Sequence, residues 1–223
     1  MKQICIIPAR GGSKRIPRKN IYKVNGKPLI QINIERLTAS DLFDEIVVSS
    51  DDPEILDISK LAGAEVHERS HELADDFTSA DAVIKEVIEL RDYPTPTIVT
   101  CVYAPNVLFP ISKLCDAIKM FKTDNCPVIT VCKFKHPLER ALVKDENDRS
   151  KIKLPEFANI RTQDCQELYF DAGQFYVANA KQWLISYDFL NNDNYSIELK
   201  NSEFVDLDDH HDLQILCAAL RNN

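Results

Sequence analysis

The sequence predicts an α/β fold, a three-layer α/β/α sandwich built around a mainly parallel sheet. Short apolar runs bounded by turn residues alternate with stretches of helical period about ten residues long. Consecutive strand–helix–strand units of this kind form right-handed crossovers, which place their strands parallel in one sheet. The chain has 223 residues, enough for one domain with its own core. We therefore expect a single domain over residues 1–223.

The first half of the chain supplies the alternation. The predicted strands are 2–8, 45–50, 64–69, 97–103 and 127–134, each an apolar run that ends at turn residues or charges. Helices are predicted between them from apolar residues at helical spacing, over 26–40, 53–62, 82–90 and 112–122. Asp52 followed by Pro53 is a helix start signal, and Thr78 with Asp81 has capping-box-like spacing.

The alternation stops between residues 135 and 170, where the chain is charged and rich in turn residues. A long irregular insert in a compact domain is usually functional, so this segment is expected to be a lid or a projecting arm. After it, 170–179 and 203–208 are predicted strands, and 210–222 is a predicted closing helix.

Composition excludes several classes of protein. The formal net charge of −8 argues against a nucleic-acid binder that relies on general positive charge. No run of about 18 apolar residues suggests a membrane span, and glycine and arginine follow too soon after the start for a secretory signal. The seven cysteines form no CxxC pair and are expected to be reduced thiols. A cytoplasmic protein is the expectation.

A basic loop follows the first strand, in the stretch "IIPARGGSKRIPRKN" at residues 6–20. Its glycines, Gly11 and Gly12, allow the backbone to approach an anion closely. Ligands of parallel sheets bind beyond the carboxyl ends of the strands, where this loop begins. It is neither a Walker A loop nor a GxGxxG loop. The alternative is a solvated basic turn, and the preceding strand and paired glycines favour a triphosphate site instead. The basic side chains are Arg10, Lys14, Arg15, Arg18 and Lys19.

An acidic segment, "EFVDLDDHHD", lies near the other end of the chain, at residues 203–212. On a strand, Asp206 and Asp208 would point to the same face and could hold one Mg²⁺ ion. The alternative for such residues is helix capping, which we assign to Asp209 and Asp212 before the last helix. The adjacent His210 and His211 point in different directions on a helix and make a poor zinc pair.

The stretch "YFDAGQFYVAN", residues 169–179, carries polar groups on a predicted strand. Alternation places Asp171 and Gly173 on one face, and Gln174 and Tyr176 on the other. Gly173 allows a ligand or another backbone to approach, and the amide and hydroxyl suit a polyhydroxylated sugar. Spacing alone leaves an ordinary central strand with a bulge equally open.

"PARGGSKRIPRKN" followed by "GKPLI" resembles the N-terminal CTP signature of the sugar nucleotidyltransferases, specifically of the cytidylyltransferases that activate nonulosonic acids. The similarity extends to the last helix and implies the family's nucleotide-diphospho-sugar transferase fold. It implies that Arg10, Lys14 and Lys19 bind the triphosphate, with Gly11, Gly12, Ser13 and Asn20 beside them. The metal-binding DxD pattern of the family falls on Asp206 and Asp208. "DAGQFY" is similar to the pseudaminic acid branch, whereas sialic acid synthetases carry an "NGAIY"-like sequence.

The resemblance implies that the anomeric hydroxyl of a sugar acid attacks the α-phosphorus of CTP and expels pyrophosphate. Arg10, Lys19 and Asp208 would then be catalytic, and Asp171, Gln174 and Tyr176 would orient the sugar. The chain departs from the family at "VYAPNVLFP", residues 102–110, where Ala104 and Asn106 are the predicted cytosine contacts.

Residues 135–170 correspond to a family arm that joins two copies and reaches the neighbouring site, so a homodimer is expected. Gln163, Arg140 or Arg161 would meet the acceptor's carboxylate, and His136 is a further candidate contact. A monomer with a mobile lid is the alternative, and it would leave arm residues such as Phe157 and Ile160 uncovered.

Other readings stay open at this point. The acceptor could be N-acetylneuraminic acid, legionaminic acid or 3-deoxy-octulosonate, which differ at "DAGQFY" and in the arm. A non-catalytic nucleotide-binding regulator would keep the fold but would not need Asp206 and Asp208. A nucleic-acid-binding module is disfavoured, because no aromatic platform is interleaved with the basic residues.

Overall fold

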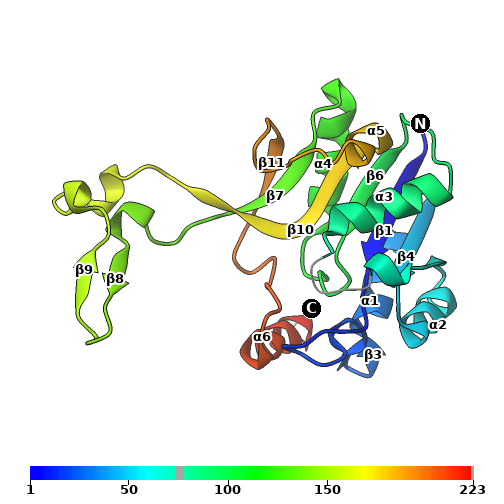
Figure 1. Cartoon of the computed structure of the whole chain (residues 1–223), viewed down its shortest axis with the longest axis horizontal. Coiled ribbons are helices and arrows are strands. Elements are labelled where there is room, and N and C mark those ends of the chain that lie inside the picture. The colour runs from blue at the N-terminus through cyan, green and yellow to red at the C-terminus, as the bar shows by residue number, and fades with distance from the viewer. Residues whose placement is uncertain (74–77, 222–223) are drawn as a thin grey trace.

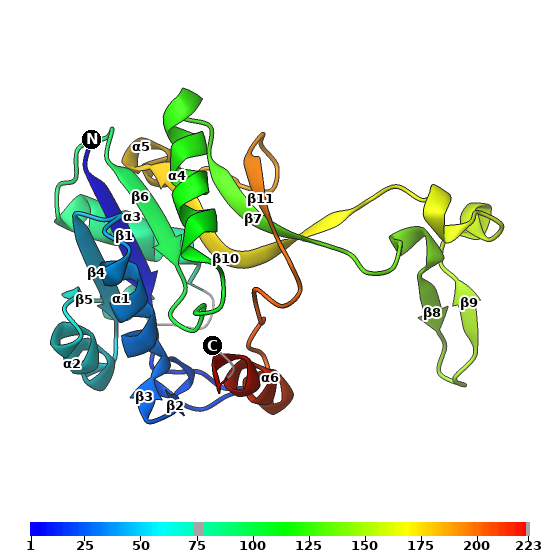
Figure 2. The ribbon, with the colours of Figure 1, turned by 180° about the vertical axis from the view of Figure 1, so that it is seen from behind.

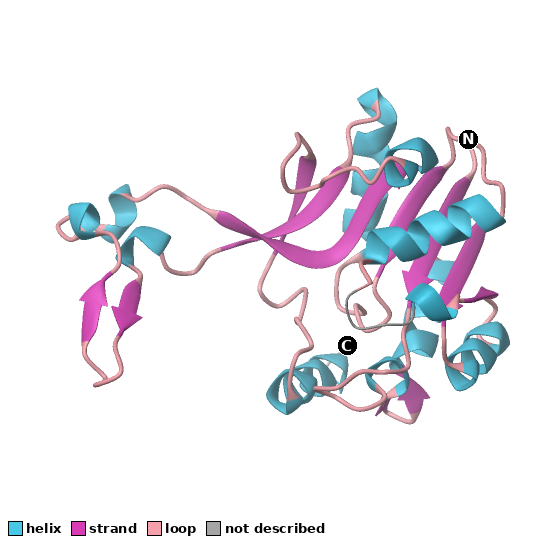
Figure 3. Cartoon of the chain, in the orientation of Figure 1, coloured by secondary structure: helices cyan, strands magenta, loops and turns pink. Residues whose placement is uncertain are grey.

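A seven-stranded sheet forms the centre of the molecule in a computed structural model, which describes residues 1–73 and 78–221 (Figures 1 and 3). Its order is β11-β7-β10-β6-β1-β4-β5. The strands are β1 (Gln3–Pro8), β4 (Glu45–Ser50), β5 (Glu65–Glu68), β6 (Ile98–Val102), β7 (Val128–Lys133), β10 (Tyr169–Asn179) and β11 (Tyr195–Leu199). Four of the neighbouring pairs are parallel, whereas β10 runs antiparallel to β6 and to β7.

Helices cover both faces of this sheet (Figures 1 and 2). One apolar core joins the sheet to α1 (Leu29–Ala39), α2 (Pro53–Leu61) and α4 (Ile111–Asp124). The other joins it to α3 (Ala80–Leu90) and α5 (Ala180–Leu184). The predicted three-layer sandwich with a mainly parallel sheet is therefore confirmed. The central strands read as near-continuous apolar runs because both of their faces are covered.

A third apolar cluster lies beside the sheet, where α6 (His210–Arg221) packs on the N-terminal loop and on the small hairpin β2 (Lys23–Val24) and β3 (Lys27–Pro28). Ile16 from the basic loop is buried there with Leu213 and Leu216 of the helix. The two ends of the sequence that carry the predicted basic and acidic motifs are thus packed together.

Residues 134–168 leave the body as a projecting arm (Figures 1 and 2). The arm carries a short hairpin of β8 (Leu142–Lys144) and β9 (Ser150–Ile152), together with three single-turn 3₁₀ helices, Leu138–Arg140, Pro155–Phe157 and Thr162–Asp164. The arm covers most of the segment 135–170 that the sequence predicts to be an irregular insert. Leu138, Leu142 and Val143 of the arm are 43%, 65% and 42% exposed.

Several predicted elements differ from the structure. The predicted strand 203–208 is irregular chain without a partner strand. Its Asp208 N–H bonds locally instead, donating to Asp206 O and to the Asp212 carboxylate. Helix α3 begins at Ala80 and is capped by Ser79, so the capping box at Thr78 and Asp81 was wrong. Neither α5 nor β11 was predicted.

The other helix starts agree with their sequence signals. The Asp52 carboxylate caps α2 by accepting from the N–H groups of Glu54 and Ile55. Asp209 accepts from the N–H groups of His211 and Asp212 at the start of α6, and Asp212 accepts from the N–H of Asp209 in return. The predicted capping roles of Asp209 and Asp212 are therefore confirmed.

None of the helices in the described ranges 1–73 and 78–221 is both long enough and apolar enough to span a bilayer. All seven cysteines lie in those ranges and none forms a disulfide; Cys5, Cys101 and Cys132 are buried.

Candidate active site

A cavity of about 360 Å³ opens at the carboxyl ends of β1, β5 and β6. Because β10 runs antiparallel to β6, its first half reaches the same edge of the sheet. The chain between β11 and α6 closes the remaining side. The lining residues are Pro8, Arg10, Ser13, Lys19, Asn20, Arg69, Thr78, Ala80, Val83, Tyr103, Pro105, Asn106, Asp171, Ala172, Gly173, Gln174, Asp206 and Leu207. Both predicted motifs therefore meet in one cavity.

From the basic loop, Arg10, Ser13, Lys19 and Asn20 line this cavity. The Lys19 Nζ donates to Leu207 O at 2.9 Å, which ties the basic loop to the acidic segment. Burial lowers the pKa of Lys19, and the nearby carboxylates of Asp208 and Asp206 partly offset that shift. Asn20 Nδ2 donates to Arg10 O at 2.8 Å and holds the two ends of the loop together.

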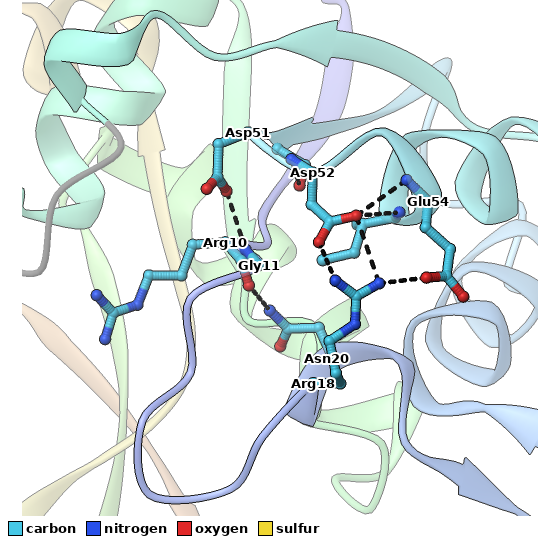
Figure 4. Close-up of polar contacts among 9 residues, drawn as sticks. Arg10, Gly11, Arg18, Asn20, Asp51, Asp52 and Glu54 are labelled. Atoms are coloured by element: carbon cyan, nitrogen blue, oxygen red, sulfur yellow. Dashed lines mark hydrogen bonds and ion pairs between the residues drawn. The ribbon is translucent and has the colours of Figure 1, made fainter.

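Other members of the basic loop face elsewhere. The Arg15 guanidinium pairs with Asp208 at 2.6 Å, outside the cavity lining. Arg18 turns away, toward Asp52 and Glu54 at the start of α2 (Figure 4). Gly12 and Lys14 do not line the cavity.

Gly11 packs against the β4–α2 turn instead of lining the cavity. A Cβ on Gly11 would lie 2.5 Å from Asp52 Oδ2, and the Gly11 N–H donates to Asp51 Oδ1 at 2.9 Å. Gly11 therefore lets the loop approach this turn, a different reason for glycine than the predicted approach of a phosphate.

The acidic segment brings Asp206 into the cavity and leaves Asp208 beside it, paired with Arg15. Burial raises the pKa of Asp206, and the nearby Asp208 carboxylate raises it further. Two carboxylates that destabilise each other's charge are suited to a hard divalent cation, which prefers such oxygen ligands. Across residues 1–73 and 78–221, no three His, Cys, Asp or Glu side chains are gathered as a metal cluster.

The loop after β6 holds the predicted cytosine contacts, Ala104 and Asn106. Ala104 is fully buried in the core and does not line the cavity, so its predicted contact with the base stays a prediction without support from the cavity lining. Asn106 lines the cavity, but its Nδ2 donates to Gly173 O at 2.7 Å and to Gln174 O at 3.1 Å. Its amide thus links this loop to β10.

Helix α1 holds the same loop from behind. Asn33 Nδ2 donates to the carbonyls of Tyr103 and Ala104, and the Arg36 guanidinium donates to that of Phe109. Burial lowers the pKa of Arg36 to about 10. The loop after β6 is therefore fixed by polar side chains of α1, of which Asn33 is fully buried.

Strand β10 is irregular where it lines the cavity. Its pairing with β7 shifts register between Asp171 and Tyr176, and Gly173 has a φ of +59°. The N–H of Gln174 donates to Thr130 Oγ1 at 3.0 Å instead of to a strand carbonyl. This bulge brings Asp171 and Gln174 into the same cavity, so the predicted alternation of their faces was wrong.

A second hollow of about 440 Å³ adjoins the first and shares Ala80, Tyr103 and Asp171 with it. Tyr176 lies there, and its hydroxyl donates to Asp171 Oδ2 at 2.6 Å. Burial and this carboxylate raise the pKa of Tyr176, so its hydroxyl is a permanent donor. Asp171 therefore lies on the wall between the two hollows.

The arm residues are not part of this cavity. Gln163 lines a groove at the base of the arm with Lys133 and Glu167. Arg140 donates to carbonyls within the arm, and Arg161 pairs with Asp164. His136 is exposed on the same segment. Within one chain, these residues do not join Asp171 and Gln174.

Arg69 is the main cavity residue that the sequence reading missed. It is 6% exposed, directly follows β5, and donates from its guanidinium to Ser49 O at 3.0 Å. Burial lowers its pKa, and Asp51 and Glu86 oppose this effect. A basic residue at the carboxyl end of a predicted parallel strand was the available signal. Tyr103 and Pro105 also line the cavity and were not predicted to do so. Each is a sequence neighbour of the predicted Ala104.

Comparisons with known proteins show which family this chain belongs to. A family model described as "Cytidylyltransferase" matches residues 4–207. A pseudaminic acid cytidylyltransferase of Campylobacter jejuni subsp. jejuni serotype O:2 is 37% identical over 219 residues, which are 96% of this chain and 94% of that protein. An N-acylneuraminate cytidylyltransferase of Streptococcus agalactiae serotype V is 28% identical over 95% of this chain and 52% of its own.

Among solved structures, one titled as CMP:2-keto-3-deoxy-manno-octonic acid synthetase complexed with CTP superposes with a TM-score of 0.72 at 17% identity, covering 100% of this chain and 99% of its own. At that identity the likeness shows a shared fold. The family match and the relative of nearly equal length carry the assignment further: this chain belongs to the cytidylyltransferase family and is a CTP-dependent nucleotidyltransferase.

Proposed function

We propose that this enzyme transfers CMP from CTP to the anomeric hydroxyl of pseudaminic acid and releases pyrophosphate. One observation carries the proposal: the basic loop, the acidic segment and the β10 bulge meet in a single cavity. The similarity to the Campylobacter jejuni protein supports pseudaminic acid as the acceptor. The "DAGQFY" stretch, residues 171–176, forms the wall on which the acceptor would lie.

The triphosphate would lie against Arg10, Ser13 and Lys19 on the cavity wall. Transfer at phosphorus asks the protein mainly for alignment and charge stabilisation. The half-buried Lys19 ammonium, already tied to Leu207 O, needs little reorganisation to meet charge that develops on the departing pyrophosphate. Arg69 adds a second, buried positive charge to the same wall.

The acceptor would enter beside the β10 bulge. Asp171 and Gln174 face the cavity, and Tyr176 fixes Asp171 through its hydroxyl. Hydrogen bonds from these groups to the sugar hydroxyls would place the anomeric oxygen against the α-phosphorus. The new bond joins these two atoms while the bond from the α-phosphorus to the oxygen shared with the β-phosphorus breaks. Pyrophosphate departs with that oxygen, and the hydroxyl proton passes to solvent water.

Asp206 and Asp208 would hold Mg²⁺ against the phosphates. Bound there, the ion would neutralise phosphate charge and lower the pKa of the attacking hydroxyl, so that no dedicated base is needed. The raised pKa of Asp206 supports this assignment, because a cation would relieve the repulsion between the two carboxylates. Asp208 would exchange its ion pair with Arg15 for the metal.

We expect two copies to assemble through their arms, with Gln163 of one arm near the cavity of the other copy. The exposed Leu138, Leu142 and Val143 support this assembly, since the body of the same chain does not cover them. The cytoplasm is the expected compartment, in keeping with seven unpaired cysteines.

The test is pyrophosphate release with Mg²⁺ and CTP, with pseudaminic acid and N-acetylneuraminic acid offered in parallel. Release with pseudaminic acid is expected, and an Asp208→Asn variant should lose it. Release with N-acetylneuraminic acid alone would show that this sugar is the acceptor, in keeping with the name of the streptococcal relative. No release with any nonulosonic acid or nucleotide would favour a non-catalytic nucleotide-binding role instead.

A further inference from the structure

The basic loop of residues 10–20 is fastened to the β4–α2 turn by a group of contacts that no phosphate would touch (Figure 4). The Arg18 guanidinium donates to the carboxylates of both Asp52 and Glu54. The Gly11 N–H donates to Asp51 Oδ1 at 2.9 Å. Gly11 lies so close to Asp52 that a Cβ would clash with it. The loop is therefore anchored at both of its ends.

Arg18 also has an unusual backbone. Its φ of 58° and ψ of 31° lie in the left-handed region, directly before the 3₁₀ turn Lys19–Ile21. For a side chain other than glycine this conformation is sterically unfavourable. Such a conformation persists only where its surroundings determine it, and here two ion pairs hold the side chain.

The turn that follows Arg18 carries two residues of the cavity. Lys19 lines the cavity and donates to Leu207 O, and Asn20 lines it and donates to Arg10 O. Arg10 points away from the Arg18 contacts (Figure 4) and lines the cavity on the other side of the loop. Fixing Arg18 therefore fixes the direction in which Lys19 leaves the backbone.

From these contacts we propose that Arg18 is a positioning residue for nucleotide binding: clamped by Asp52 and Glu54, it sets the turn that presents Lys19 to the triphosphate. The sequence alone suggests instead that Arg18 grips phosphate directly. The proposal rests on the proposed CTP site, and it assigns Asp52 and Glu54, two acidic residues, a favourable part in binding a polyanion.

The two roles of Arg18 give opposite expectations for one variant, Asp52→Asn with Glu54→Gln. Asparagine caps a helix about as well as aspartate, so α2 keeps its start. A positioning Arg18 loses its anchor, and the dissociation constant for CTP should rise roughly tenfold, the scale on which supporting contacts act. An Arg18 that grips phosphate would be released toward the ligand, and CTP binding would stay the same or strengthen.

Arg18→Gly removes the clamp while glycine tolerates the left-handed turn without steric cost. It should weaken CTP binding to the same extent as the double carboxylate variant, and combining all three changes should add little. Glu35→Gln is the matched control: it breaks the exposed ion pair with Lys27 at 2.8 Å and should change CTP affinity by less than about twofold.

Two measurements distinguish a failure of the Arg18 clamp from a failure of the proposed CTP-dependent function. Calorimetric titration with CTP and Mg²⁺ gives the dissociation constants, and hydrogen exchange of the amides of residues 10–22 without nucleotide reports the anchoring itself. Faster exchange in both clamp variants, with CTP weakened and the Michaelis constant of the acceptor unchanged, supports the clamp. Unchanged exchange, or CTP binding that stays the same or tightens in the double carboxylate variant, overturns it. Wild-type protein that binds no nucleotide would refute the proposed function, and exchange would still decide the clamp.

Discussion

The proposed Mg²⁺ site can be tested at single carboxylates of the acidic segment. Replacing Asp206 or Asp208 with Asn keeps the side-chain shape and removes one negative charge from a pair that already raises the pKa of Asp206. Pyrophosphate release should fall by at least about 100-fold, because several kcal/mol of charge stabilisation depend on the ion. The Mg²⁺ concentration for half-maximal rate should rise in parallel.

Asp116→Asn, on the exposed surface of α4, is the matched control and should keep the wild-type rate and Mg²⁺ dependence. A full rate in the Asp206 and Asp208 variants would show that these residues only shape the segment before α6.

His67 gives the fold a pH dependence that can be measured separately from catalysis. Its Nδ1 lies 3.0 Å from Ser49 Oγ, and its Nε2 lies 3.8 Å from Glu86 Oε2 on α3. Burial lowers the pKa of His67 below its usual 6.5; Glu86 opposes this, and Arg91 and Arg69 add to it. The unfolded chain therefore binds the proton more readily, and the contribution of His67 to stability is lost as pH falls below about 6.5.

A His67→Gln variant should show a smaller loss of stability than the wild type when the pH drops from about 7 to 5.5, measured by urea unfolding. His136→Gln, which changes an exposed arm residue, should follow the wild-type curve. Equal pH dependence in all three proteins would contradict the assignment to His67.

At the scale of elements, the β10 bulge is the feature that joins fold and site. Gly173 has a φ of +59°, and a Cβ added there would have room, since the nearest group it would meet is the Tyr176 hydroxyl at 4.0 Å. Gly173→Ala should therefore destabilise the protein through backbone strain, by about 1–2 kcal/mol. Because Asn106 bonds to Gly173 O, the Michaelis constant of the acceptor should rise as well.

Gly12→Ala is the control for that prediction, since Gly12 has no positive φ and its Cβ would meet nothing within 4 Å. Its midpoint of thermal unfolding should stay near that of the wild type. If Gly173→Ala were equally neutral, the strained bulge would not be required by the fold.

The same strand shows where sequence reasoning ends. Apolar runs and helix start signals located the strands β1 and β4 and the cap at Asp52, because these depend on local composition and local hydrogen bonds. The bulge depends on Thr130 and Asn106, which come from elements distant in sequence. No local pattern records such partners, so Asp171 and Gln174 were placed on opposite faces.

Residues 203–208 were predicted to form a strand that the structure does not contain. Alternating apolar and acidic residues are typical of a strand, yet this segment has no partner strand. It runs instead from β11 toward the basic loop, where Leu207 O accepts from Lys19. One of its apolar residues still packs in a core, since Leu207 is buried against α6 and the basic loop. The alternation therefore reflects the burial of Leu207 and not pairing with another strand.

On the scale of the whole molecule, the arm extends away from the sandwich (Figure 2), and its side chains Leu138, Leu142 and Val143 are exposed. If two copies assemble through it, Leu138→Asp with Leu142→Asp should raise the dissociation constant of the dimer by about 100-fold or more. Sedimentation velocity over a range of protein concentrations measures this. Leu61→Asp, an 89% exposed position on the body, should leave assembly unchanged. A wild-type protein that sediments as a monomer at every concentration would rule out the dimer.

Assembly through the arms also predicts that one active site uses residues of two chains. Gln163→Ala should impair the arm's contribution, and Asp208→Asn should disable the cavity of its own chain. In a mixture of equal amounts, refolded together, half of the dimers pair one variant with the other. Each such dimer then has one cavity with an intact Asp208 facing an intact Gln163, so about a quarter of the wild-type rate should return. Activity no greater than the mean of the two separate variants would place Gln163 outside the neighbouring site, and the arm would then serve assembly alone.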